Sequence, residues 1–188
     1  MKLGKTLYLT DRKSWRAWLA KNHSTETEIW LIYYRKETGK PRISYNDAVE
    51  EALCYGWIDS TVNGIDKDRF AQRFSVRKRT SVFSQMNKER IYTLIAQKKI
   101  TKAGLDAIAH VFDPAKDTAE HFFIAPDILE PLKADKEAWK NYQKFPDPYK
   151  RIRIAFIASR RRHGTEKFQN SLKHFIDIAS EKQNGIFY

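Results

Sequence analysis

The sequence has very little cysteine and no long apolar stretch. Cys54 is the single cysteine among 188 residues, so no disulfide can form within the chain, which favours a reducing compartment. No segment approaches the roughly 18 consecutive apolar residues that a membrane-spanning helix needs, and no apolar signal core follows residues 1–5. These absences predict a cytoplasmic protein without a transmembrane segment.

Motifs of the common enzyme and metal-site classes are missing as well. The sequence contains no HExxH, CxxC or GxSxG motif and no glycine-rich phosphate loop. Its five histidines do not have the spacing of metal ligands. We therefore expect no metal and no cofactor, and a binding function rather than a catalytic one.

The composition indicates a folded and basic protein. Aromatic residues make up 13% of the chain and are spread along it, which argues against disorder. The net charge of +12 is concentrated in two windows: residues 69–102 carry ten Lys or Arg against one acid, and residues 148–173 carry eight against one. Such patches favour an anionic partner, either nucleic acid or an acidic protein. The alternative is a solvated basic surface without a partner.

Mixed helix and strand patterns in residues 1–112 predict an α+β domain, with an antiparallel sheet and packed helices. Residues 28–35 are a continuous β-branched and aromatic run, which is typical of a central strand. After Ser44, a good N-cap, apolar residues recur at helical spacing through residues 45–53. Gly56 is placed to end that helix.

A hairpin is predicted directly after this helix. Residues 57–62 and 70–76 alternate as two strands, and the inward face of the second is expected to include Val76. The pair at 63–64, Asn-Gly, predicts a type I′ turn, while the polar residues 66–68 offer a competing turn.

The last third of the chain has only helical patterns. Residues 113–120 are polar and contain Pro114, and we interpret residues 113–125 as a linker. Residues 126–188 then predict a small all-α region, in which the segment after Phe145 begins a new helix with Pro148 in its first turn.

The junction between helix and strand, residues 51–60, is the predicted functional centre. Glu51 and Asp59 could serve acid–base chemistry, but pairing with Arg73 or Arg77 across the sheet is the preferred interpretation. Either arrangement would place a charged site on the surface of the sheet.

The only thiol lies in the same junction. Cys54 has no histidine near it in sequence, and it ends a helix, where the helix dipole disfavours a thiolate. We interpret Cys54 as a buried small hydrophobe rather than a nucleophile.

Two sets of candidate site residues follow, and no catalytic residue is assigned. The ligand-binding set shares the junction, the hairpin and the segment after it: Glu51, Trp57, Asp59, Arg73, Arg77, Ser84 and Asn87. The nucleic-acid-binding set comes from the two basic windows: Lys78, Arg79, Lys88, Arg90, Arg160, Arg161 and Arg162. The leading hypothesis is a non-enzymatic protein that binds an anionic ligand or acidic macromolecule. The alternatives are a pocket or enzyme centred on Glu51, Asp59, Arg73 and Arg77, and a nucleic-acid-binding protein.

Several motifs together carry a resemblance to a known family. They are Trp15-x-x-Trp18-Leu19-x-x-Asn22-His23, Ile29-Trp30-Leu31, Ser44-Tyr45-x-x-Ala48-Val49-Glu50-Glu51-Ala52-Leu53-Cys54-Tyr55-Gly56-Trp57-Ile58-Asp59, Arg73-Phe74-x-x-Arg77, Ser81-x-Phe83-Ser84-x-x-Asn87 and Ala103-Gly104-Leu105. In this order they resemble the YdeI/OmpD-associated family of bacterial proteins, also described as bacteriocin-protection proteins. The resemblance covers residues 14–110 best.

The resemblance implies a bacterial protein linked to tolerance of bacteriocins or envelope stress. It also implies a YjbR/CyaY-like α+β fold for the N-terminal half, for which nucleic-acid binding has been suggested. It brings no catalytic residues.

Overall fold

The structure of the protein, a computed structural model, describes residues 3–113 and 122–181. The chain divides into two compact units, each with its own buried core. The units comprise residues 1–82 with 90–113, and residues 83–89 with 114–188. Most of the predicted linker, residues 113–125, lies outside the described residues.

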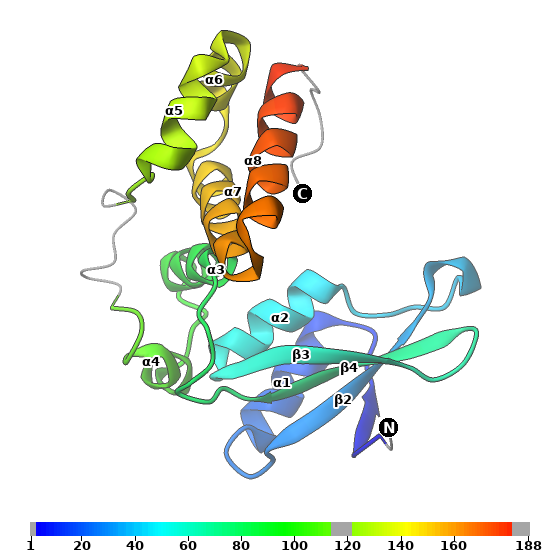
Figure 1. The fold of residues 1–188 in the computed structure, drawn as a ribbon. Helices are drawn as coiled ribbons and strands as arrows, with labels where there is room; N and C mark the ends of the chain where they lie inside the picture. Colours follow the sequence, from blue (N-terminus) through cyan, green and yellow to red (C-terminus); the bar gives the residue numbers. More distant parts are fainter. Residues whose placement is uncertain (1–2, 114–121, 182–188) are drawn as a thin grey trace. The chain divides into compact units, whose positions relative to one another are not determined.

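The first unit combines one sheet with helices, so the α+β prediction is confirmed (Figure 1). Its elements are β1 (Thr6–Tyr8), α1 (Arg12–Asn22), β2 (Glu28–Tyr34), η1 (Lys36–Thr38), α2 (Tyr45–Cys54), β3 (Trp57–Gly64), β4 (Arg69–Val76), the later part of α3 (Gln85–Ala96) and α4 (Lys102–Ile108).

The four strands are arranged in the order β1-β2-β4-β3. Strand β2 is central, as its apolar run predicts, and pairs antiparallel with β4, which pairs antiparallel with β3. The expectation of an antiparallel sheet is wrong for β1, which pairs parallel with β2. The reason is that α1 connects these two strands, and a helical crossover returns the chain in the same direction.

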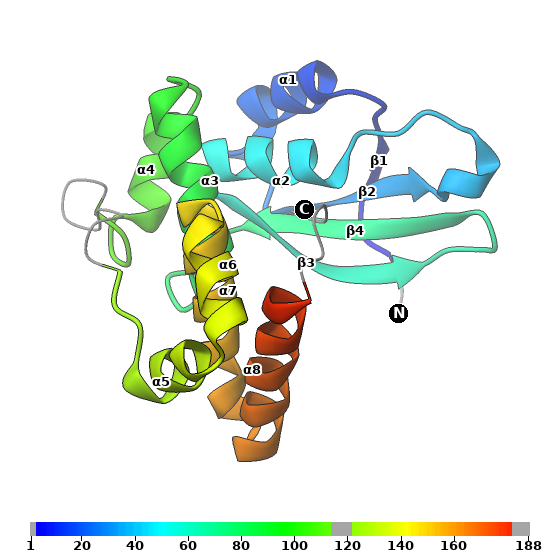
Figure 2. The same cartoon turned by 90° about the horizontal axis from the view of Figure 1, so that it is seen from above.

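Helices α1 and α2 lie side by side over one face of the sheet (Figure 2). The ring centroids of Trp15 and Phe74 are 5.5 Å apart, and those of Trp18 and Trp57 are 5.8 Å apart. Because indoles bury large apolar areas, these contacts fix α1 on the sheet. The helix-covered face is therefore the core of the first unit.

Helix α2 begins and ends where the sequence predicts. The Ser44 hydroxyl accepts a hydrogen bond of 3.0 Å from the Asp47 backbone N–H, as an N-cap does. Gly56 follows the helix with φ +75°, the left-handed conformation that favours glycine. The end of α2 and the start of β3 are thus determined locally.

The hairpin turn lies at the second of the two predicted positions. Asn63 and Gly64 remain in the ladder, opposite Ala71 and Phe70, so the predicted Asn-Gly turn is wrong. The chain turns at residues 66–68 instead, where the Asp66 carboxylate accepts a 2.7 Å hydrogen bond from the backbone N–H of Arg69.

Strand β4 follows the predicted alternation with one exception. Phe74 is fully buried, but Val76 is 42% exposed, although it was predicted to face the core. Val76 is the last residue of β4 and lies at the end of the sheet. Opposite, β3 contains a bulge between Asp59 and Val62, which brings these two side chains to the same face of the sheet.

The second unit is a bundle of helices, as predicted (Figure 1). Besides the first residues of α3 it contains α5 (Pro126–Ala134), α6 (Lys136–Lys144), α7 (Asp147–Ser159), η3 (Arg160–His163) and α8 (Thr165–Ser180). Its core includes Ile128, Leu132, Ile157 and Phe175, all fully buried. Pro148 lies in the first turn of α7, where its missing N–H leaves no helical bond unmade.

Candidate functional site

The junction after α2 is a packing centre rather than an open site. The Cys54 carbonyl accepts hydrogen bonds from the backbone N–H of Thr101, at 3.1 Å, and from its hydroxyl, at 2.6 Å. The Arg77 backbone N–H donates to the Gly56 carbonyl at 2.9 Å. A Cβ on Gly104 would lie only 2.5 Å from the Cys54 carbonyl oxygen, so α4 approaches α2 closely at a glycine.

Glu51 is buried at this junction, with 2% of its surface exposed. Its two carboxylate oxygens accept hydrogen bonds from Arg12 Nε and Arg16 Nη1, each at 2.6 Å. The predicted pairing of Glu51 with Arg73 or Arg77 is therefore wrong. Glu51 faces α1 instead. Its partners Arg12 and Arg16 are more than 30 residues away in the sequence, so no local pattern indicates the pairing.

The predicted arginine partners have other roles. Arg73 lies on the opposite face of the sheet from the helices and donates to Glu28 at 3.0 Å. Arg77 is 6% exposed and donates to the Ser81 carbonyl at 2.9 Å, and burial lowers its pKa. Trp57 is 1% exposed, and its indole N–H donates to the His23 carbonyl at 3.2 Å. None of these three side chains forms an open ligand-binding face.

The Cys54 side chain is fully buried. Burial, together with the nearby negative charge of Glu51, raises the pKa of its thiol to about 11. The interpretation of Cys54 as part of the core is therefore confirmed.

We expect the Cys54 thiol to react slowly with a thiol reagent such as DTNB at pH 8, because both burial and the raised pKa suppress the thiolate. The rate should rise by at least about tenfold in a denaturant that unfolds the protein. Absorbance of the released thionitrobenzoate measures both rates. Rapid stoichiometric labelling of the folded protein would contradict this expectation.

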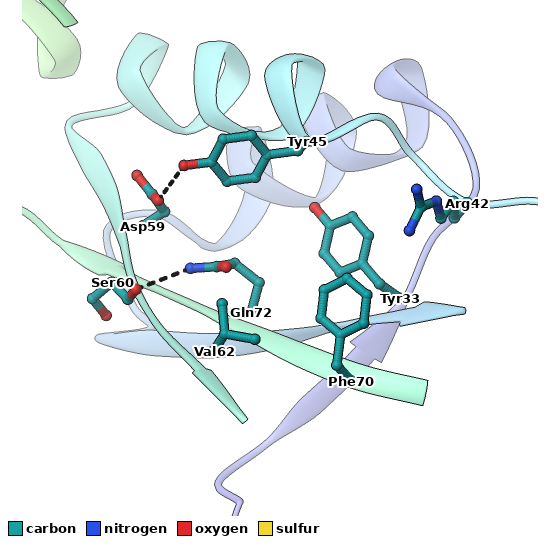
Figure 3. Close-up of a pocket in the computed structure, with 8 residues that line it drawn as sticks. All are labelled: Tyr33, Arg42, Tyr45, Asp59, Ser60, Val62, Phe70 and Gln72. Atoms are coloured by element: carbon teal, nitrogen blue, oxygen red, sulfur yellow. Dashed lines mark hydrogen bonds between the residues drawn. The ribbon is translucent and has the colours of Figure 1, made fainter. Parts of the chain in front are cut away.

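A pocket of about 420 Å³ opens on the helix-covered side of the first unit, between the sheet and the start of α2 (Figure 3). Residues from β2, β3, β4, α2 and the loop before α2 line it: Tyr33, Arg42, Tyr45, Asp59, Ser60, Val62, Phe70 and Gln72. This volume suits a small organic molecule. Asp59 is the only member of the predicted ligand-binding set that lines this pocket.

One hydroxyl in the pocket is buried without a partner. Tyr33 is 2% exposed, and its Oη forms no hydrogen bond within the described part of the chain. In Figure 3 this oxygen points up from the sheet, between Tyr45 and Arg42. An unsatisfied buried hydroxyl is unfavourable by about 1–3 kcal/mol, so most proteins avoid one. At a pocket, it is a position that a ligand atom can satisfy.

The other polar groups of the pocket are held in place by neighbours. The Tyr45 hydroxyl donates to the Asp59 carboxylate at 2.7 Å. The Arg42 guanidinium donates through Nη1 to the Tyr34 carbonyl at 3.0 Å. The Gln72 amide donates to the Ser60 carbonyl at 3.2 Å. The pocket therefore presents a carboxylate and a guanidinium in fixed orientations.

Tyr45, Asp59 and Arg42 all act electrostatically on the Tyr33 hydroxyl. Burial raises the pKa of Tyr33, Tyr45 and Asp59 raise it further, and Arg42 opposes them. Burial and the hydrogen bond to Asp59 raise the pKa of Tyr45 to about 12. Both phenols are therefore neutral hydrogen-bonding groups near neutral pH.

Local features of the sequence build this pocket, although its members are far apart in the chain. The bulge in β3 turns Asp59 and Val62 to one face, and the rings of Tyr33 and Phe70 stack 5.2 Å apart on paired strands. Sequence reasoning missed every lining residue except Asp59. The available signal was Gln72, a polar residue in the inward-facing series of β4, which is an exception to the apolar pattern.

Ser84 and Asn87, two further predicted ligand-binding residues, belong to the second unit. The Ser84 hydroxyl accepts a 3.3 Å hydrogen bond from the Asn87 backbone N–H at the start of α3. Asn87 is 8% exposed. The Ser84 hydroxyl thus caps the start of α3, so the observed role of Ser84 is to begin a helix.

The first basic window is partly neutralised by acids from outside it. Ion pairs join Arg69 to Asp66, Arg73 to Glu28 and Lys102 to Asp106. Of the predicted nucleic-acid-binding residues in this window, Lys78 and Arg79 are exposed, Lys88 and Arg90 are half-buried, and Arg90 donates to the Asn46 side chain at 2.9 Å. In the folded protein, these acids therefore compensate part of the positive charge of residues 69–102.

The three arginines predicted from the second window differ from one another. Arg161 forms a 2.7 Å ion pair with Asp127. Arg160 and Arg162 form no ion pair within residues 3–113 and 122–181. Of these three arginines, Arg160 and Arg162 therefore retain a charge that no described acid compensates.

Two absences hold for the described residues, 3–113 and 122–181. These residues contain no group of three or more His, Cys, Asp and Glu side chains that could hold a metal ion. None of their helices combines the length and apolar character needed to cross a membrane.

Comparison with known proteins gives one match. No curated protein and no solved structure matches the chain. A family model described as "Domain of unknown function (DUF8412)" matches residues 7–107, which is more than half of the chain and includes the whole pocket. The chain therefore belongs to the DUF8412 family.

Proposed function

We propose that the first unit is a binding domain for a small polar organic molecule, and that the pocket beside Tyr33 holds it. The observation that carries this proposal is the Tyr33 hydroxyl, which is buried, lines the pocket and has no partner among the described residues. The ligand would place a polar atom on Tyr33, a hydrogen-bond donor on Asp59 and an anionic or carbonyl group on Arg42.

The chemistry of the lining favours binding over catalysis. No histidine or cysteine is among the lining residues, and both tyrosines have raised pKa values. A general base that works near neutral pH needs a pKa close to 7. The Asp59 carboxylate accepts a 2.7 Å hydrogen bond from the Tyr45 hydroxyl, which engages one of its oxygens. The enzyme alternative centred on Glu51, Asp59, Arg73 and Arg77 has little support, because these four side chains lie in separate environments.

Under this proposal, an anionic group of the ligand would bind the guanidinium of one residue, Arg42. A link to bacteriocin or envelope-stress tolerance remains a proposal that rests on the resemblance to the YdeI/OmpD-associated family. We also propose a cytoplasmic location, supported by the single buried cysteine.

The Tyr33→Phe variant tests the proposal. Without ligand, we expect it to be as stable as the original protein or slightly more stable, because it removes an unsatisfied buried hydroxyl. Thermal unfolding should be measured with a panel of amino acids, nucleoside monophosphates and aromatic carboxylates at millimolar concentration. At least one compound should raise the Tm of the original protein, and Tyr33→Phe should weaken its binding by about tenfold.

Tyr34→Phe is the matched control, since Tyr34 is the next residue on β2 and faces the other side of the sheet. It should bind the active compound as the original protein does. The proposal fails if no compound of the panel changes the Tm or the backbone NMR shifts of the lining residues. It also fails if Tyr33→Phe and Tyr34→Phe behave alike toward an active compound.

A further inference from the structure

A second charged surface lies on the helical unit, away from the pocket residues in sequence. It is formed by Arg153, Phe156, Arg160, Arg162 and Lys167, which we call the arginine ridge. The first three occupy positions i, i+3 and i+7, so they share one side of α7 and its continuation into η3. Lys167 lies in the first turn of α8.

An aromatic ring is exposed in the middle of the ridge. Phe156 is 47% exposed, although it is a large apolar side chain. The guanidinium carbons of Arg153 and Arg160 lie 5.6 and 5.7 Å from its ring centroid, within cation–π range. The Nε atoms of both arginines are buried and have no hydrogen-bond partner in the described residues. Two cations therefore lie near the exposed ring, and the Nε–H group of each is an unused hydrogen-bond donor.

The charge of the ridge is not compensated by acids. Neighbouring cations are paired: Arg151 with Glu89, Lys150 with Asp147 and Arg161 with Asp127. By contrast, no ion pair within the described ranges involves Arg153, Arg160, Arg162 or Lys167. Glu166 is exposed beside them and makes no ion pair with any of them there.

The positive charges of the ridge also act on a neighbouring histidine, His163. Desolvation lowers the pKa of His163, and the positive charges of Arg162, Arg160 and Lys167 lower it further. These three cations are thus close enough to one another to act on a single imidazole. A cluster of like charges without counter-charges attracts an anionic partner.

We infer that the arginine ridge binds single-stranded nucleic acid, with phosphates on its cations and a base stacked on Phe156. A polyanion without rings would satisfy the arginines but would leave the Phe156 ring in water. Duplex DNA would present phosphates, but its bases are already stacked on each other. An unpaired strand offers both groups at once, and stacking on an aromatic side chain tolerates any base.

Fluorescence anisotropy with a labelled single strand of about 12 nucleotides tests the inference. The affinity of the full chain should fall between about 50 and about 200 mM salt, with a log–log slope near −2 for about three neutralised phosphates. Arg160→Ala should reduce the steepness of the slope by about 0.7. Phe156→Leu should weaken binding by about tenfold at one salt concentration without changing the slope, because it removes the ring and keeps the charges.

Lys173→Ala is the control for the loss of one charge, because Lys173 is exposed on α8 and already paired with Asp177. It should change the affinity by less than about twofold. Circular dichroism should show that each variant remains folded. The inference is overturned if Phe156→Leu binds as the original protein does, if duplex DNA or heparin binds as tightly as the single strand, or if Lys173→Ala loses as much affinity as Arg160→Ala.

Discussion

Replacing Gly56 with alanine is expected to lower the free energy of unfolding of the first unit by about 4 kcal/mol. The backbone at Gly56 has φ +75°, which is unfavourable for a residue with a Cβ by about 1–2 kcal/mol. In addition, the new Cβ would lie 2.7 Å from Ala107 Cβ and 2.9 Å from the Ala103 carbonyl oxygen. Relieving these contacts requires movement of α4, which typically adds about 1–3 kcal/mol.

Gly39→Ala separates the two causes. Gly39 has φ +66°, but a Cβ there would meet no atom within 4 Å, so this variant should lose only about 1 kcal/mol. Urea unfolding followed by tryptophan fluorescence measures both variants, since Trp15, Trp18, Trp30 and Trp57 all belong to the first unit. Equal losses for Gly56→Ala and Gly39→Ala would show that the close contact with α4 is not important.

Replacing Glu51 with alanine is expected to cost about 3 kcal/mol of stability, the second-largest effect. The carboxylate is buried and accepts short hydrogen bonds from Arg12 and Arg16, and its removal leaves both guanidinium groups without that acceptor. Loss of one partner of a buried pair is usually worth about 3–5 kcal/mol. We place the value at the lower end because the side chains of Arg12 and Arg16 are 29% and 35% exposed and can reach water.

Glu50→Ala is the matched control on the same helix. Glu50 also pairs with Arg12, at 2.8 Å, but its side chain is 28% exposed, so the variant should lose less than about 1 kcal/mol. Denaturant midpoints of the two variants, measured at neutral pH, decide the comparison. A loss for Glu50→Ala as large as that for Glu51→Ala would contradict a special role for the buried carboxylate.

The junction at residues 51–60, which the sequence predicts to be the functional centre, is mainly a packing centre. In residues 51–60, Glu51, Gly56 and Trp57 hold helices and sheet together. Of residues 51–60, Asp59 and Ser60 line the pocket. A concentration of unusual residues in a sequence can mark a packing centre as readily as a binding site, because both need specific side chains.

The elements that the sequence predicts well are those that depend on local interactions. Ser44 caps α2 through a backbone group three residues away, and Gly56 closes it through its own φ angle. The buried strand at residues 28–34 follows from a continuous apolar run. In each case, the physical cause lies within a few residues of the effect, so a pattern in the sequence is sufficient.

The hairpin shows where local reasoning stops. Asn63-Gly64 favours a tight turn, but the ladder with β4 continues through both residues. The Asp66 carboxylate closes the turn three residues later through the backbone N–H of Arg69. The pairing of Asn63 and Gly64 with β4 therefore outweighs the local preference of these two residues for a turn.

By itself, the sequence determined the fold class, the central strand, the limits of α2 and the burial of Cys54. Only the tertiary structure decided the partners of the charges: Glu51 with α1, Arg73 with Glu28 and Arg161 with Asp127. It also assembled the pocket around Tyr33 and left the arginine ridge uncompensated. The reason is physical, since periodicity reports which face of an element is apolar, whereas ion pairing and pocket formation depend on which faces meet in space.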